Sequence, residues 1–160
     1  MEYENMIIKD EFFRYARIED IYCLQLIINE FGTLSDFSEE FELDFVICKY
    51  NDVLEFNHIS KVKNLNGILK DGLKAGTGDF GYGIYIIPSD DEIANDNLKT
   101  YVSEMFDYNE KNILMIKGTY SGEYYKCIYG EGKEGYCIIE SNNIPILDYK
   151  IIKIEDYLLT

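Results

Sequence analysis

The segment HISKVKNLNGILKDGLKAGTGDFGYGIY, residues 58–85, carries most of the fold information in this chain. It begins at the end of residues 53–58, a stretch that is typical of a short strand. Apolar residues recur at helical spacing over residues 64–70, and Gly72 is placed to end that helix. A glycine-rich loop then leads into a second apolar strand, residues 84–87. The segment therefore predicts the order strand, helix, glycine loop, strand.

The N-terminal part of the chain has a different pattern. Apolar residues at helical spacing over residues 18–28 predict a helix, which Gly32 is placed to end. Residues 41–45 alternate apolar and acidic side chains, as a half-buried strand does. No linker rich in proline or glycine follows. We therefore expect residues 1–50 to form an extension packed on a main domain of residues 51–160.

The second half of the chain predicts one more helix and then a series of strands. Ser89 is a candidate cap for a helix that runs through residues 101–105. Four apolar or aromatic runs follow, at residues 113–117, 124–129, 136–139 and 149–154. Helices early and strands late predict an α+β fold with a split, mostly antiparallel sheet.

Composition limits the partners of this protein. The 160 residues are 47% hydrophobic and 15% aromatic, which is ample for a packed core. The formal net charge is −15 and no polybasic patch is present, so direct binding to DNA or RNA is disfavoured. The excess of acids indicates either an ordinary solvated surface or a surface that docks onto a basic partner.

Cysteine usage and the first residues bear on metal sites and on the compartment. The four cysteines (Cys23, Cys48, Cys127 and Cys137) are scattered and the chain has a single histidine, which argues against a structural zinc site. The opening Met1-Glu2-Tyr3-Glu4 is acidic where a signal peptide is basic, and no apolar run is long enough to span a bilayer. We expect a cytoplasmic protein with free thiols and no membrane association.

The order of the motifs resembles a known superfamily. His58-Ile59-Ser60 ends a strand, a helix ends at residues 68–73, Gly81-Tyr82-Gly83-Ile84-Tyr85 follows, and acidic residues lie near a late strand. Over residues 52–160 this order resembles the His-Tyr-Glu branch of the ADP-ribosyltransferases, which includes the poly(ADP-ribose) polymerases and diphtheria-toxin-like enzymes. The resemblance implies an ADP-ribosyltransferase-like fold that uses NAD+ as its substrate and needs no metal.

The resemblance implies a role for three residues at the first strand end. His58 would hydrogen-bond a hydroxyl of the adenosine-side ribose, a task suited to a neutral imidazole. The backbone N–H and C=O of Ile59 would hold the nicotinamide amide, with Ser60 nearby. Taken alone, a single histidine at a strand end is more often an ordinary surface or edge residue, so the interpretation depends on the order of all the motifs together.

The glycine-tyrosine block would form the rest of the binding site. The ring of Tyr85 would stack on the nicotinamide, and Tyr101 on the following helix would complete the sandwich. Glycines such as Gly83 allow the backbone to approach the ligand closely.

The catalytic acid is the part of the resemblance that the sequence leaves open. In this branch a glutamate at the start of a late strand grips the nicotinamide ribose and stabilises the oxocarbenium-like transition state. The apolar run that follows Glu134 favours it, but the register of the family places the acid at Gly135, and a bulge there would restore the match. Glu140 and Glu131 are the alternatives, and a site without any acid is the remaining one.

These observations predict a mono-ADP-ribosyltransferase that acts on a macromolecular target, with a protein more favoured than a nucleic acid. A short chain of this kind is typical of a bacterial or phage effector or toxin, which could act in a host cytoplasm. The alternative is a binding protein or inhibitor on a catalytically degenerate transferase fold, whose acidic surface blocks a basic partner. An RNA 2′-phosphotransferase shares the fold, but this chain lacks the clustered arginines that RNA requires.

Overall fold

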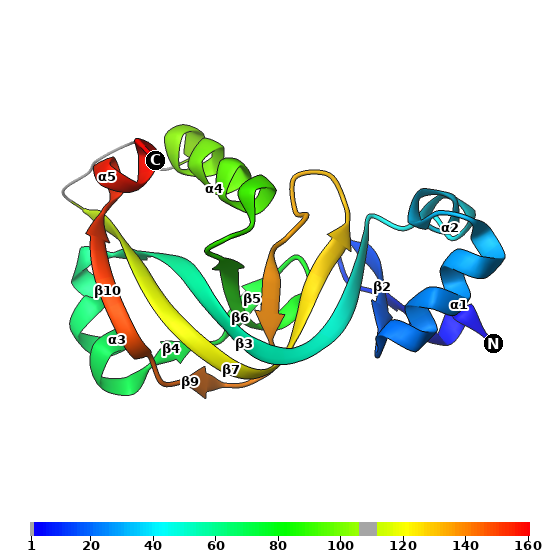
Figure 1. The fold of residues 1–160 in the computed structure, drawn as a ribbon, viewed down its shortest axis with the longest axis horizontal. Coiled ribbons are helices and arrows are strands. Elements are labelled where there is room, and N and C mark those ends of the chain that lie inside the picture. The colour runs from blue at the N-terminus through cyan, green and yellow to red at the C-terminus, as the bar shows by residue number, and fades with distance from the viewer. Residues whose placement is uncertain (1, 106–111) are drawn as a thin grey trace.

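Two strands of 17 residues each, β3 (Phe45–Lys61) and β7 (Ile113–Tyr129), form the centre of the molecule. They pair antiparallel along nearly their whole length, as the computed structural model shows (Figure 1). The structure describes residues 2–105 and 112–160. The predicted mixed α+β class with a large, mostly antiparallel sheet is confirmed. The two strands predicted at residues 113–117 and 124–129 are one continuous strand, β7.

The outer edges of the two long strands are covered by shorter ones. β3 pairs with β2 (Arg14–Ile18) in parallel and with β6 (Gly81–Pro88) antiparallel. β7 pairs with β8 (Cys137–Ile139) and with β10 (Leu147–Lys153). Because β6 also pairs with β8, the strands β3, β6, β8 and β7 close a ring of pairings. The remaining strands are β1 (Ile7–Lys9), β4 (Leu73–Lys74), β5 (Gly76–Gly78) and β9 (Asn143–Ile144).

The helices lie mainly at the two ends of the molecule. Figure 1 shows α1 (Ile21–Phe31) and α2 (Leu34–Glu40) at one end, and α3 (Leu65–Asp71) and α5 (Ile154–Leu158) at the other. α4 (Glu92–Met105) lies along the molecule above β6. Short 3₁₀ turns occur at Tyr3–Met6 and Val62–Asn64. Within residues 2–105 and 112–160, no helix is both long and apolar enough to cross a membrane.

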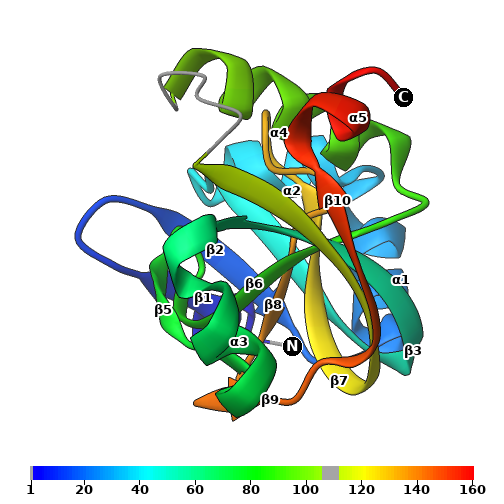
Figure 2. The ribbon, with the colours of Figure 1, turned by 90° about the vertical axis from the view of Figure 1, so that its left-hand side faces the viewer.

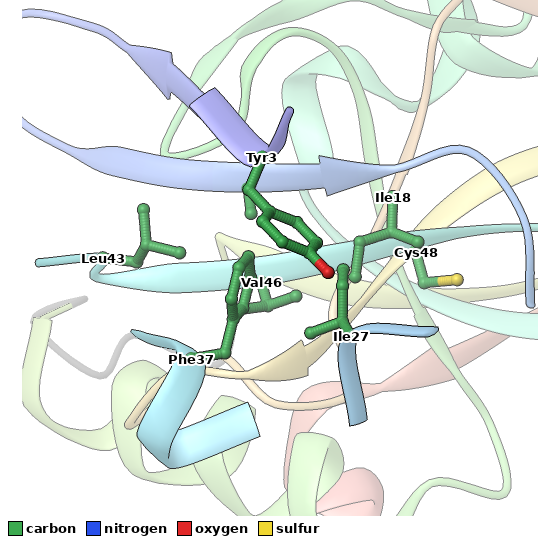
Figure 3. Close-up of a cluster of buried hydrophobic side chains, with 8 residues drawn as sticks. Tyr3, Ile18, Ile27, Phe37, Leu43, Val46 and Cys48 are labelled. Atoms are coloured by element: carbon green, nitrogen blue, oxygen red, sulfur yellow. The ribbon is translucent and has the colours of Figure 1, made fainter. Parts of the chain in front are cut away.

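The N-terminal residues share the main sheet. Tyr3, Ile27 and Phe37 are buried against Val46 of β3, as Figure 3 shows. β2 adds a further strand beside β3, and the β1–β2 hairpin projects from the side of the molecule in Figure 2. The expected boundary between residues 50 and 51 therefore falls inside the continuous strand β3.

Two local predictions were wrong. Residues 41–45 were expected to form a strand, but Phe41 and Glu42 form a turn after α2, with a φ of 54° at Glu42. The strand begins only at Phe45, because the chain must reverse direction after the helix. Ser89 was expected to cap α4, but Asp91 lies directly before the helix and its Oδ1 accepts the N–H of Ala94 at 2.9 Å. The Ser89 hydroxyl donates instead to Oδ1 of Asn57 at 3.2 Å.

Candidate ligand-binding site

A pocket of about 430 Å³ lies between the β5–β6 hairpin, α4 and the loop that joins β7 to β8. Four residues that the sequence nominated for cofactor binding line it: His58 from β3, Gly83 and Tyr85 from β6, and Tyr101 from α4. We call it the tyrosine pocket, because Tyr85, Tyr101 and Tyr136 all contribute to its walls. Residues that are distant in sequence therefore meet around one cavity.

His58 is a neutral hydrogen-bonding group in this pocket. Its Nδ1 lies 3.2 Å from the carbonyl oxygen of Tyr85. Since a carbonyl only accepts, Nδ1 must carry the proton, and Nε2 is left as an acceptor. Burial lowers the pKa of His58, which keeps the imidazole uncharged at neutral pH, although the contact with Tyr85 acts in the opposite direction.

Tyr85 closes the turn between β5 and β6. Its hydroxyl donates to the carbonyl oxygen of Gly81 at 2.6 Å and accepts the N–H of Phe80 at 2.9 Å. Its ring lies against Gly78 so closely that a Cβ at Gly78 would come within 2.5 Å of ring carbons. Burial raises the pKa of the Tyr85 hydroxyl well above its ordinary value. Tyr85 is thus both a wall of the pocket and the residue that shapes its loop.

Phe80 in the same turn is held from the N-terminal strand β2. The hydroxyl of Tyr15 donates to the carbonyl oxygen of Phe80 at 2.8 Å, and this contact is buried. The Phe80 ring packs edge-on against Phe45, with ring centroids 5.3 Å apart. Both backbone polar groups of Phe80 are therefore bound by tyrosine hydroxyls, one from β2 and one from β6. Sequence reasoning missed Tyr15, because its partner is 65 residues away.

An ion pair joins two loops across the tyrosine pocket. Lys133 Nζ lies 2.9 Å from Oδ2 of Asp79, and both residues line the cavity. The ammonium also lies 5.3 Å from the ring centroid of Tyr136. Burial raises the pKa of Tyr136 to about 12. Sequence reasoning missed these three residues. The available signal was weak: Lys133 adjoins the nominated Glu134, and Asp79 lies in the glycine-rich loop.

Two of the nominated cofactor-binding residues lie outside the lining of the pocket. The side chain of Ile59 packs against the buried cluster that contains Ile87 and Met115. Ser60 is buried, and its hydroxyl donates to the carbonyl oxygen of Lys61 at 3.1 Å. The strand therefore presents the side chain of His58 to the pocket, whereas the side chains of the next two residues lie outside its lining.

The three nominated acids also lie outside the lining. Glu134 and Glu131 belong to the turn at residues 131–135 that precedes β8, where Glu134 is half-buried and Glu131 is exposed. Gly135 has a φ of 89° and lies in this turn, not in a strand, so the structure has no β-bulge there. Glu140 lies elsewhere, where its Oε2 accepts a hydrogen bond from Arg17 Nη1 at 2.9 Å. Among the described residues, Asp79 is the carboxylate that lines the pocket.

Comparisons with protein-family models, with curated proteins and with solved structures found no match. The side chains of the tyrosine pocket indicate which ligand chemistry it suits. The tyrosine rings offer faces for stacking a planar group, and Nε2 of His58 offers a hydrogen-bond acceptor. Lys74 and Lys133 offer positive charge for an anion. These groups together suit a nucleotide.

Proposed function

We propose that this protein binds NAD+ in the tyrosine pocket and transfers its ADP-ribose to a macromolecular target, as a mono-ADP-ribosyltransferase. The observation that carries the proposal is the meeting of His58, Gly83, Tyr85 and Tyr101 around one cavity. These residues come from three separate elements, and the resemblance assigns each of them to the binding of NAD+. A chance turn or a surface histidine would not be expected to bring them together.

The side chains of the pocket support a division of work on NAD+. The tyrosine rings orient the nicotinamide by stacking, and Nε2 of His58 accepts a hydrogen bond from a ribose hydroxyl. When the glycosidic C–N bond breaks, nicotinamide leaves with the bonding electrons and the ribose becomes oxocarbenium-like. A nearby carboxylate stabilises this charge, and a base accepts the proton of the attacking nucleophile. Asp79, which lines the pocket, or Glu134 would supply that carboxylate. Glu134 would do so only if the turn at residues 131–135 moved its side chain into the pocket.

A second candidate function is a binding protein without turnover. It is favoured by the positions of Glu131, Glu134 and Glu140, which all lie outside the lining of the pocket. The net charge of −15 suits an inhibitor that covers a basic surface of its partner.

The proposed setting of both functions is the cytoplasm, either of the source cell or of a host. The four cysteines are free thiols, which are stable in a reducing compartment. The acidic surface favours a protein target over a nucleic acid, because it would repel a phosphate backbone.

The test combines NAD+ binding with label transfer. Calorimetry with NAD+ and incubation with labelled NAD+ and a bacterial lysate would be run on the wild type, His58→Ala, Asp79→Asn and Glu134→Gln. Glu39→Gln is the control, since Glu39 is exposed on α2 and lies outside the pocket lining. Transfer that is lost in His58→Ala and in one acid variant supports a transferase and identifies its acid.

The other outcomes separate the two candidates. NAD+ binding without transfer by any form favours the binding protein. Failure of the folded wild type to bind millimolar NAD+ would overturn the assignment of the tyrosine pocket to this ligand. Transfer that persists in both Asp79→Asn and Glu134→Gln would remove both residues as the acid.

A further inference from the structure

Lys133 reaches the tyrosine pocket from a loop whose backbone fixes its direction. The N–H of Lys133 donates to the carbonyl oxygen of Gly130 at 3.0 Å, and the N–H of Tyr136 donates to the carbonyl oxygen of Lys133 at 3.1 Å. The loop is anchored at its far end, where Gly135 lies against Asp91 with no room for a Cβ. The turn therefore directs the side chain of Lys133 into the cavity, whereas the adjacent Glu134 lies outside the lining of the cavity.

The ammonium of Lys133 is paired with the carboxylate of Asp79. The two side chains are 34% and 26% exposed, so water and salt weaken their attraction. A lysine ammonium has three donors, and a nucleotide diphosphate as a whole offers it more acceptor oxygens and more negative charge than a carboxylate does. An anionic ligand in the cavity can therefore compete with Asp79 for Lys133. Lys74 lines the same cavity and adds a second positive charge.

We propose that Lys133 is the phosphate-binding residue of the tyrosine pocket and that Asp79 is a latch, which holds the ammonium until a nucleotide phosphate replaces the carboxylate. The inference rests on the proposed function in taking NAD+ as the ligand, whose diphosphate would contact Lys133. It goes further in naming a phosphorylated nucleotide as the class that the pocket selects. It also makes Asp79 a competitor of the ligand, which leaves Glu134 as the carboxylate of the proposed reaction.

The test is a set of affinities measured by calorimetry at low salt. The ligands are NAD+, ADP-ribose, AMP and the phosphate-free adenosine. Lys133→Gln should weaken the binding of ADP-ribose about tenfold, because a charge-assisted hydrogen bond is lost, and should leave adenosine unchanged. Asp79→Asn should strengthen ADP-ribose binding about threefold, because the competing ion pair is gone. Lys133→Arg should retain most of the affinity.

Lys70→Gln is the control for a general change of charge. Lys70 is an exposed residue at the end of α3, outside the pocket lining, so its replacement should leave every affinity unchanged. Thermal unfolding of each variant verifies that it is folded before its affinity is compared.

The outcomes separate this inference from the proposed function. If NAD+ binds equally well to the wild type and to Lys133→Gln, the inference is overturned and NAD+ binding stands. If AMP and ADP-ribose bind through Lys133 but NAD+ does not bind, the inference is supported and the proposed function fails. Weaker binding of ADP-ribose to Asp79→Asn would overturn the latch, since it would mean that Asp79 contacts the ligand. Absence of binding by any nucleotide overturns both.

Discussion

His58 is the sole histidine of the chain, and burial lowers its pKa below the ordinary value of about 6.5. Below about pH 6.5 the imidazole of His58 is therefore protonated in the unfolded chain, whereas in the folded protein it stays neutral down to a lower pH. We expect the free energy of unfolding to decrease as the pH falls from about 7.5 to about 5.5, over the window that begins at the unfolded pKa. Urea denaturation across this range measures the slope.

The control is His58→Gln, which keeps a polar side chain and should lose the part of the slope that belongs to the imidazole. Because the histidine is unique, its ring resonances in a proton NMR titration are unambiguous. A pKa of His58 at or above about 6.5 would contradict the proposed neutral acceptor.

The Tyr85 hydroxyl offers a second prediction for a single residue. Tyr85→Phe removes both of its hydrogen bonds and leaves the N–H of Phe80 and the carbonyl of Gly81 without this partner. The free energy of unfolding should fall by about 1–3 kcal/mol, as measured by chemical denaturation. Tyr82→Phe on the same strand is the control, since Tyr82 is 60% exposed, and it should change stability by less than about 0.5 kcal/mol. Equal effects of the two variants would refute the role of Tyr85 in the turn.

The residues of the tyrosine pocket were only partly predictable. His58, Gly83 and Tyr85 could be nominated because they lie in one segment, where local spacing limits their positions. Asp79 and Lys133 could not, because their meeting depends on the conformations of two loops from opposite halves of the chain. Periodicity carries no information about such a contact.

Among the elements, α3 has one glycine inside it and another directly after its last residue, and the two have opposite requirements. Gly72 ends the helix with a φ of 87°, and a Cβ there would overlap the backbone carbonyl of Ile144. Gly67 lies inside the helix, where a Cβ would meet nothing within 4 Å. Gly72→Ala should therefore destabilise the protein by at least about 2 kcal/mol, from backbone strain and overlap together. Gly67→Ala should stabilise it by about 0.5–1 kcal/mol.

Chemical denaturation of the two variants measures this difference in sign. A Gly72→Ala variant as stable as the wild type would show that the end of α3 can move away from β9. A destabilised Gly67→Ala variant would show that this face of α3 is less open than its surroundings indicate.

Helices that end at a glycine were predictable from the sequence. Strands whose length depends on pairing with a distant strand were not. Gly32 and Gly72 end α1 and α3 as expected, with φ values of 88° and 87°. The length of β3 was not foreseen, because its middle is largely exposed and polar and is held by pairing with β7. The strand expected at residues 41–45 failed because alternation over five residues also fits a turn between a helix and a strand.

For the molecule as a whole, the α+β class could be predicted from composition and from the sequence pattern. The closure of β3, β6, β8 and β7 into a ring of pairings could not. β6 lies between β3 and β8. β3 and β7 are paired although the described chain between them contains the 3₁₀ turn at Val62–Asn64, α3, β4, β5, β6 and α4. Such pairings join residues that are distant in sequence, so local propensity cannot specify them. The same closure brings the β5–β6 hairpin and the β7–β8 loop to opposite sides of the tyrosine pocket.

The net charge of −15 acts on the whole folded molecule. Thirty acidic residues face fifteen basic ones, so one-to-one pairing of every base would leave fifteen carboxylates without a basic partner. Folding brings these charges together, and salt screens their repulsion. Raising NaCl from about 20 mM to about 300 mM should therefore stabilise the protein by about 1 kcal/mol and raise Tm by about 2–4 °C. Differential scanning calorimetry measures the shift.

The control variant for charge is Glu39→Gln/Glu40→Gln. Both residues are exposed in the last turn of α2, where negative charge also opposes the helix dipole. The double variant should have a higher Tm than the wild type at low salt and a smaller response to added NaCl. A Tm of the wild type that does not rise with salt would mean that the carboxylates are spaced widely enough to tolerate one another. In that case the acidic surface would impose no stability cost that a basic partner could relieve.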